Sequence, residues 1–168
     1  MRMRARFAVA AVLPLTVAAT AWFVLTERPA VPDATFVLLS GRKLSTAELR
    51  GKVYLVNFWA TSCATCIKEM PRMIDTYRRF QGRDFDFIAV AMSYDPPDYV
   101  ADYTRTRHLP FRVARDADGS SAREFFGVRL TPTTFVVDKR GRVVKRILGE
   151  PDFAELDRLI RRELDAPA

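Results

Sequence analysis

The chain carries two kinds of hydrophobic pattern, and each predicts a different element of structure. Residues 53–59 (VYLVNFW) are apolar almost throughout and are rich in β-branched and aromatic side chains. A run of this kind is typical of a strand that is buried on both faces of a sheet. The sequence therefore predicts a central strand that ends just before a pair of cysteines, and residues 85–92 (FDFIAVAM) are predicted as the next strand.

Shorter apolar runs at the two ends of this pattern predict hairpins. Residues 35–39 precede a turn signal at residues 40–41, which indicates an opening hairpin. Residues 133–138 and residues 142–147 are joined across an Arg-Gly turn, which indicates a closing hairpin.

Other segments show the period of an α-helix. After Cys63, apolar residues recur three and four positions apart, and Pro71 predicts a kink or a break one turn into that helix. A second helix is predicted from Asp95, as its N-cap, toward Thr106. Strands that alternate with helices before a closing hairpin and helix indicate an α/β sandwich with a mixed central sheet. The last helix is predicted from the apolar stripe Phe153, Leu156, Ile160 and Leu164.

Residues 7–25 (FAVAAVLPLTVAATAWFVL) contain no charged residue and follow a short arginine-rich start. As a helix they would extend for roughly 28 Å, close to the thickness of about 30 Å of a bilayer's hydrocarbon core. Residues 19–21 have the small-x-small form of a cleavage site, but residues 22–25 continue the apolar run beyond it. We therefore expect residues 1–25 to be an uncleaved membrane anchor, with a cleaved signal sequence as the alternative.

The rest of the chain is expected to form one domain outside the cytoplasm. Arginines before the apolar run predict a cytoplasmic N-terminus and an extracytoplasmic position for the residues after Glu27. Residues 26–33 contain two prolines and no periodic pattern, so they are predicted to be a short, stiff linker. With 168 residues, 49% of them hydrophobic, the chain is suited to a single domain, predicted at residues 34–168.

The net charge of +7 does not indicate a nucleic-acid ligand. Arg2, Arg4 and Arg6 account for three of these charges, which leaves +4 for the remainder of the chain. Lysines and arginines in the remainder are interspersed with acidic residues, as is typical of a solvated surface.

Cys63 and Cys66 are the only cysteines, and they lie where the first buried strand gives way to a helix. Backbone N–H groups at a helix N-terminus stabilise a thiolate, so the pKa of Cys63 is expected to fall from about 8.5 toward the range of about 3.5 to 7.5 found in such motifs. Cys63 is therefore the predicted nucleophile. Cys66, on the same helical face, is the predicted resolving thiol, which attacks a mixed disulfide at Cys63 and leaves a redox-active Cys63–Cys66 disulfide.

Other uses of the two cysteines remain open at this point. A purely structural disulfide would close a very short loop and would stabilise the fold little, and two inert thiols are disfavoured by the position at a helix start. Structural zinc requires four cysteine or histidine ligands, and the chain offers three residues of these types, the two cysteines and His108. Copper(I) could take two thiolates with Met70 or Met73, although both methionines fall on the apolar stripe of the helix, where packing is favoured.

Residues 58–66 (FWATSCATC), followed by Glu69 and Pro71, form one motif, and residues 130–138 (LTPTTFVVD) form a second. Together they resemble the TlpA/ResA-type thioredoxin-like proteins, and the resemblance extends from about Ala34 to the C-terminus. It implies a thioredoxin-like α/β fold in which helices flank a central mixed β-sheet, with an N-terminal β-hairpin and a βα insertion. The predicted transmembrane helix would precede that domain.

The resemblance also implies roles for residues around the cysteines. Thr131-Pro132 is expected to be a cis peptide opposite the cysteines, where Thr131 pairs with a substrate strand, and Trp59 is expected to line the substrate groove. Glu69 stands one helical turn after the second cysteine, where a buried carboxyl could exchange protons with that thiol. Asn57, where many thioredoxins carry an aspartate, cannot titrate, and this favours Glu69 as the proton partner. A core position for Trp59 and an exposed one for Glu69 are the alternatives.

These features predict an extracytoplasmic thiol:disulfide oxidoreductase that reduces disulfides of partner proteins, as the resemblance implies for cytochrome c maturation. The predicted localisation is the bacterial inner membrane, single-pass, with the catalytic domain in the periplasm. A membrane thiol-electron carrier is the expected reductant, no cofactor or metal is expected, and the chain is expected to be a monomer. A copper(I)-binding chaperone, or a disulfide oxidase or isomerase of the same fold, is the alternative.

Overall fold

A mixed sheet of seven strands forms the centre of the computed structural model, which describes residues 28–168. Its strands are β1 (Thr35–Leu38), β2 (Lys43–Ser45), β3 (Val53–Trp59), β4 (Phe85–Ala91), β5 (Arg112–Arg115), β6 (Thr133–Val137) and β7 (Val143–Leu148). They lie side by side in the order β2-β1-β5-β4-β3-β6-β7. β3, β4 and β5 are parallel to one another, whereas the remaining neighbours pair antiparallel. Both predicted hairpins are therefore confirmed.

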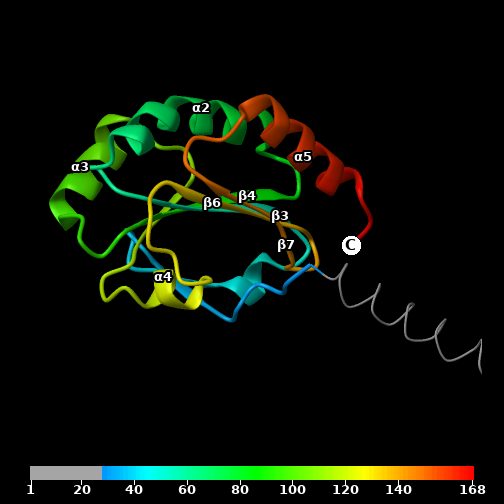
Figure 1. Cartoon of the computed structure of the whole chain (residues 1–168), viewed down its shortest axis with the longest axis horizontal. Helices are drawn as coiled ribbons and strands as arrows, with labels where there is room; N and C mark the ends of the chain where they lie inside the picture. Colours follow the sequence, from blue (N-terminus) through cyan, green and yellow to red (C-terminus); the bar gives the residue numbers. More distant parts are fainter. Residues whose placement is uncertain (1–27) are drawn as a thin grey trace, which may run out of the picture.

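Helices cover the two faces of this sheet (Figure 1). α2 (Ala64–Phe80), α3 (Pro97–Thr106) and α5 (Phe153–Asp165) lie on one face, and α4 (Ser120–Glu124) lies on the other. A short 3-10 helix, η1 (Thr46–Leu49), follows β2. The predicted α/β sandwich with a mixed central sheet is confirmed.

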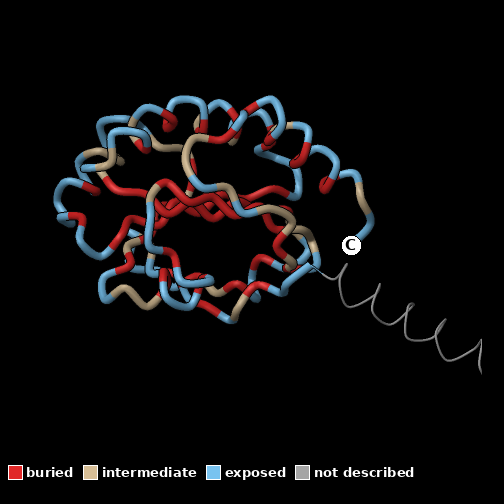
Figure 2. Tube along the Cα trace, in the orientation of Figure 1, coloured by how far each residue is buried: buried red, intermediate tan, exposed pale blue. Residues whose placement is uncertain are grey.

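β3 supplies side chains to two separate hydrophobic cores. All seven of its residues are buried, and the buried strands form the middle layer of the molecule (Figure 2). Leu55 and Trp59 pack in the core beneath α2 and α5, whereas Val56 and Phe58 pack with Phe125 on the other face. This burial on both faces is what the nearly continuous apolar run predicts.

A kink or a break was predicted at Pro71; helix α2 runs through this residue without a break. Proline lacks the N–H that would bond to the carbonyl of Ile67 one turn earlier. Pro71 itself is exposed, but Met70 before it and Met73 after it are buried in the same core. Packing of this buried side maintains the helix despite the missing hydrogen bond.

Residues 28–33, predicted as part of a linker, are bonded to the domain instead. Ala30 forms an antiparallel bridge with Arg142 next to β7. The backbone N–H of Val143 donates to the carbonyl of Pro29 at 2.8 Å. β7 is an edge strand of the sheet, and its free backbone groups accept this additional segment.

The predicted membrane anchor, residues 1–25, lies outside the described residues. Among the helices of residues 28–168, none combines the length and the hydropathy needed to cross a bilayer.

Phe125 and Phe126 offer a matched test of the core on the α4 face, because they are 0% and 38% exposed. The ring of Phe125 lies 5.9, 5.8 and 5.0 Å from those of Phe36, Phe58 and Phe135. Phe125→Ala is expected to lower the free energy of unfolding by about 3–5 kcal/mol, because it leaves a cavity. The control Phe126→Ala is expected to cost about 1 kcal/mol. Urea unfolding followed by circular dichroism measures both, and equal losses would contradict the core position of Phe125.

Candidate active site

The two cysteines lie where β3 passes into α2. β3 ends at Trp59, and Cys63 is the N-cap of α2. Parallel neighbours present their carboxyl ends at the same edge of a sheet, so β3 and β4 end side by side. β6 is antiparallel to β3 and begins there, with Thr133 opposite Phe58. We call this edge, where β3 ends at Trp59 and β6 begins at Thr133, the cysteine end of the sheet.

Cys63 and Cys66 form a disulfide, with their Cα atoms 5.2 Å apart. Cys66 is 0% exposed, whereas Cys63 is only partly buried. The backbone N–H of Cys66 donates to Cys63 Sγ, with 3.2 Å between nitrogen and sulfur. A sulfur atom that approaches from outside therefore reaches Cys63 and not Cys66.

The N-terminus of α2 favours negative charge on Cys63 Sγ. Peptide dipoles in this 17-residue helix concentrate partial positive charge at its first turn. That first turn contains no aspartate or glutamate to offset the effect. A thiolate at Cys63, the form that attacks disulfides, is therefore stabilised by the backbone alone.

The peptide between Thr131 and Pro132 is cis and lies beside the cysteines, as predicted. The carbonyl oxygen of Thr131 is 3.6 Å from Cys63 Sγ. Thr131 is only partly buried, and its Oγ1 lies 3.3 Å from the hydroxyl of Tyr94. The segment that leads into β6 thus forms a wall beside the accessible sulfur.

Glu69 lies one turn after Cys66 in α2 and is 0% exposed, so the exposed alternative is wrong. Its Oε1 accepts a hydrogen bond of 3.2 Å from Asn57 Nδ2, which also donates to Thr134 Oγ1 at 2.9 Å. Burial raises the pKa of Glu69 to about 8; the Asn57 hydrogen bond opposes this rise, and the charge of Glu150 adds to it. Glu69 therefore retains a proton at neutral pH.

Trp59 does not line a substrate groove, contrary to the prediction. It is 0% exposed, and its ring centroid lies 5.3 Å from that of Tyr103 in α3. Side chains alternate between the two faces of β3, and that of Trp59 points to the face that carries α2, α3 and α5. There α3 covers it. Trp59 fills the core that also contains Cys66.

The sequence patterns did not identify Asp95 as part of this site. It was predicted to cap α3, but the N-cap of that helix is Pro96. The buried carboxylate of Asp95 instead accepts hydrogen bonds from the backbone N–H of Thr61 at 2.6 Å and from its hydroxyl at 2.5 Å. Asp95 thus fastens the turn that leads to Cys63. The position of Asp95 after β4, whose end meets that of β3, is the signal that could have indicated this contact.

Two large apolar side chains near the sulfur were also missed. Tyr94 is 60% exposed and contacts Thr131 through its hydroxyl, and Leu130, next to Thr131, is 62% exposed. Large apolar groups at a reactive site are typical of protein-binding surfaces.

Met70 and Met73, the two candidate copper ligands, are 1% and 0% exposed. Both belong to the core cluster beneath α2. The packing role favoured by their helical spacing is therefore confirmed.

A bonded pair of sulfurs, one reachable and one enclosed, can exchange its disulfide with an outside thiol or disulfide. The fold and this chemistry together define a thioredoxin-like thiol:disulfide oxidoreductase. Residues 26–160 match the Redoxin family model, so the chain belongs to the Redoxin family.

Individual relatives agree with this assignment. Thiol-disulfide oxidoreductase ResA of Bacillus thuringiensis (strain Al Hakam) is 33% identical over 132 residues, which cover 78% of this chain and 75% of the relative. ResA of Geobacillus thermodenitrificans (strain NG80-2) is 34% identical over 130 residues, which cover 74% of each chain. A thioredoxin-family thiol:disulfide interchange protein of Chlorobium tepidum TLS has a crystal structure that matches with a TM-score of 0.74 and 30% identity, over 83% of this chain and 98% of that chain. The resemblance to TlpA/ResA-type proteins is confirmed.

The buried carboxyl of Glu69 makes stability depend on pH. Its pKa is about 8 in the folded chain and about 4.3 in the unfolded chain, so between these values the folded state keeps a proton that the unfolded state releases. The resulting stabilisation is fully present below the lower value and is lost as the pH rises through the higher one. Between pH values of about 5 and 8, the free energy of unfolding of the oxidised chain is expected to fall less in Glu69→Gln than in the wild type.

Urea unfolding at several pH values measures this difference, with Glu124→Gln, which changes an exposed glutamate, as the control. Parallel pH profiles of the wild type and Glu69→Gln would contradict a protonated Glu69. The same variant is expected to change the pH dependence with which Cys66 reacts in the reduced chain, because amide nitrogen and oxygen cannot take its proton.

Proposed function

We propose that this chain reduces disulfides of extracytoplasmic partner proteins through Cys63 and Cys66 while residues 1–25 tether it to a membrane. Unequal access to the two sulfurs carries the proposal. Cys63 is only partly buried and lies 3.6 Å from the Thr131 carbonyl, whereas Cys66 is 0% exposed. A partner therefore bonds to Cys63, and the protein's own second sulfur then displaces it.

Reduction begins at Cys63 of the dithiol form. Its thiolate attacks one sulfur of the partner's disulfide, a bond forms between Cys63 Sγ and that sulfur, and the partner's disulfide bond breaks. The departing sulfur of the partner takes up a proton. The N-terminus of α2 stabilises the attacking thiolate, and the backbone of Thr131 pairs with an extended segment of the partner.

Cys66 completes the transfer. Its thiol gives a proton to the minor fraction of Glu69 that is ionised at a pH below its pKa of about 8, and the resulting thiolate attacks Cys63 Sγ. The Cys63–Cys66 bond forms, the mixed disulfide breaks, and the partner leaves with both electrons. With a pKa of about 8, Glu69 retains the proton in the oxidised form at neutral pH. It returns the proton to Cys66 when a membrane thiol-electron carrier reduces the disulfide again.

The relatives support this chemistry through their names, thiol-disulfide oxidoreductase and thiol:disulfide interchange protein. The TlpA/ResA resemblance favours clients of cytochrome c maturation, and the arginine-rich start followed by an apolar run favours a bacterial inner membrane with the domain in the periplasm. We infer a monomer as the working unit, because one chain supplies both sulfurs and the proton partner.

Substitution of the resolving cysteine tests the roles of the two sulfurs. In cells that produce Cys66→Ser, partners are expected to stay bound to Cys63 as mixed disulfides, because no second thiol displaces them. Non-reducing gels after acid quenching detect the complexes, and mass spectrometry identifies the partners. Cys63→Ser is the control and is expected to trap none. Equal trapping by both variants would show that the roles are assigned wrongly.

The direction of electron flow is tested by equilibrating the purified wild-type chain, which has both cysteines, with glutathione. A reductase is expected to have a reduction potential below about −200 mV, whereas a value near the −120 mV or so of DsbA would support an oxidase of the same fold. Reduction of a protein disulfide in the presence of a metal chelator separates the proposed activity from that of a copper(I) chaperone.

The tether is tested within residues 7–25. Leu15→Arg places a charge near the middle of the run, which costs about 2.5–3.5 kcal/mol of insertion free energy. The wild type and the control Leu15→Ala are expected to resist extraction from membranes with alkaline carbonate, whereas Leu15→Arg is expected to be extracted. Mass spectrometry of the intact chain reports on cleavage, and a chain that lacks residues 1–21 would support a cleaved signal sequence.

A further inference from the structure

The described chain begins at the end of the molecule opposite the cysteine end. Lys139 follows β6, and its carbonyl accepts a hydrogen bond of 2.9 Å from the N–H of Gly51, which precedes β3. β3 and β6 are antiparallel, so both residues lie at the edge of the sheet away from Trp59 and Thr133. Arg28, the first described residue, meets the domain at this edge (Figure 1).

An ion pair with a buried carboxylate fixes Arg28 there. Arg28 Nη1 lies 2.8 Å from Glu163 Oε2, and Nη2 lies 3.3 Å from Oε1. Nη1 is also 3.3 Å from Asp138 Oδ2. Glu163 in α5 is 5% exposed and also lies 3.4 Å from Arg162 Nε, so separation from Arg28 would remove the shorter and two-bonded of its two cationic partners from a buried carboxylate. The entry of the chain into the domain is therefore held in one place.

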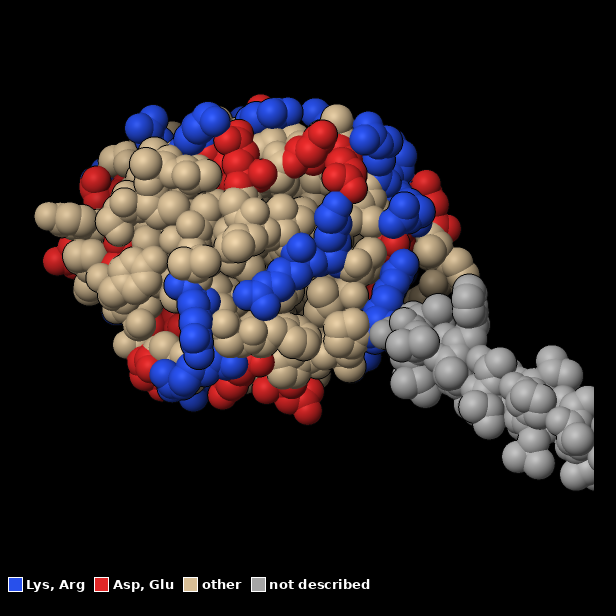
Figure 3. Space-filling model, in the orientation of Figure 1, with Lys and Arg blue, Asp and Glu red and all other residues tan. Residues whose placement is uncertain are grey.

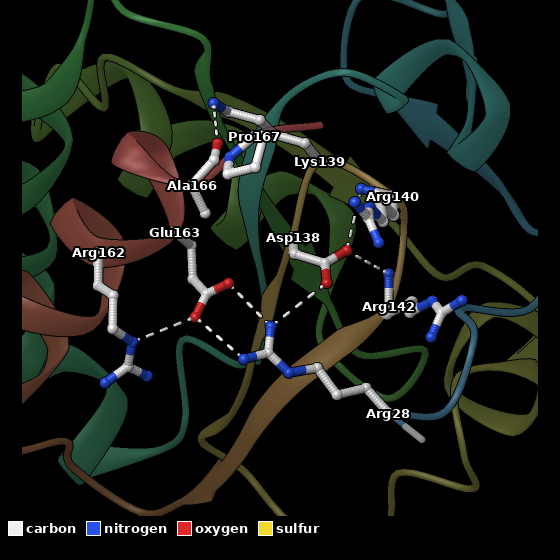
Figure 4. A pocket seen from close by; sticks show the side chains of 9 residues that line it. All are labelled: Arg28, Asp138, Lys139, Arg140, Arg142, Arg162, Glu163, Ala166 and Pro167. Atoms are coloured by element: carbon white, nitrogen blue, oxygen red, sulfur yellow. Dashed lines mark hydrogen bonds and ion pairs between the residues drawn. The ribbon is translucent and has the colours of Figure 1, made fainter. Parts of the chain in front are cut away.

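Basic side chains surround this entry point. A depression of about 460 Å³ is lined by five cationic side chains and two carboxylates, an excess of three positive charges. Both carboxylates, Asp138 and Glu163, are bonded to Arg28 (Figure 4). Lysine and arginine side chains border the same end of the molecule in the space-filling view (Figure 3). We call this surface the basic pole, made of Arg28, Arg50, Lys139, Arg140, Arg142 and Arg162.

We propose that the basic pole docks on the anionic phospholipid headgroups of the membrane that holds residues 7–25. The inference rests on the anchoring proposed above. Two residues, 26 and 27, separate the apolar run from Arg28, and two extended residues span at most about 7 Å. The membrane surface is therefore within reach of the pole. Guanidinium groups match phosphate oxygens in charge and in hydrogen-bond geometry.

The range and strength of the attraction suit this arrangement. Charges interact over a screening length of about 8 Å at physiological ionic strength, so the pole lies within the field of the surface. Each basic side chain near an anionic membrane raises the association constant by about fivefold. With several such side chains, the basic pole is expected to bind the nearby membrane surface.

Docking at this pole would set the direction in which the domain points. β3 leads from the pole toward Cys63, and its seven residues extend for about 20 Å at about 3.3 Å each. The accessible sulfur would therefore face away from the lipid. Clients would meet it at a height of about 20 Å or more above the headgroups.

The test uses the isotope-labelled full chain in nanodiscs that carry a gadolinium chelate on a fraction of the lipid headgroups. Phosphatidylcholine alone is compared with phosphatidylcholine mixed with phosphatidylglycerol. Addition of phosphatidylglycerol is expected to increase relaxation of the Gly141 and Ala166 amides at the pole, and to leave those of Ser62 and Thr131 unchanged. High salt is expected to reverse the increase.

A double variant and a matched control test whether position or net charge matters. Arg140→Gln with Arg162→Gln removes two exposed cations of the pole and is expected to reduce the ratio of docked to undocked domain by at least about fivefold. Arg123→Gln with Arg129→Gln removes two exposed cations that follow the carboxyl end of β5, and is expected to retain docking. Equal losses in the two double variants would overturn the proposal.

The same samples separate this proposal from the anchoring on which it rests. Loss of the chain from the nanodiscs would contradict the anchor. A retained chain whose pole amides relax equally in both lipids would contradict headgroup docking alone, and would leave the pole as a surface for a different, acidic partner.

Discussion

The burial of β3 on both faces is the constraint on which the rest of the structure depends. Each of its seven residues is enclosed, and its two edges are bonded to β4 and β6. A strand held on four sides cannot slide or twist without disturbing both cores. Its end at Trp59 is therefore a fixed point, and the turn that presents Cys63 extends from it. Asp95, from the end of β4, holds that turn through both hydrogen bonds to Thr61.

Within its first two turns, helix α2 stabilises the charged form of one group and the neutral form of another. Its N-terminus stabilises negative charge on a sulfur that partners must reach, whereas the interior one turn later keeps the Glu69 carboxyl protonated at neutral pH. Asn57 makes this possible, because a neutral amide gives the carboxyl a hydrogen bond without adding a second charge. A helix with one exposed and one buried side thus both stabilises the Cys63 thiolate and carries the buried Glu69 carboxyl that holds a proton.

Local patterns were sufficient to predict β3, α2 and the cysteine pair, since an apolar run and a helical repeat are visible in consecutive residues. Contacts between distant segments could not be predicted from such patterns. Trp59 is covered by Tyr103 of α3, and Asp95 bonds to Thr61 instead of capping α3, so both positions depend on which elements are neighbours in the sheet. The cis peptide before Pro132 was expected from family resemblance, because intrinsic preference favours trans. Residues 28–33 join the domain because β7 is an edge strand, which their own composition does not reveal.

The enclosure of Cys66 means that electrons enter and leave this protein through a single atom, the sulfur of Cys63. In the proposed cycle, a reductant and a client that use the same atom exclude each other, so no complex that contains both of them takes part in the transfer. Turnover in the proposed reductase cycle then follows a double-displacement scheme, in which the domain alternates between a reduced form that reacts with clients and an oxidised form that reacts with the reductant. A client or a reductant in excess therefore competes with the other for Cys63, and the rate of disulfide reduction depends on the ratio of their concentrations.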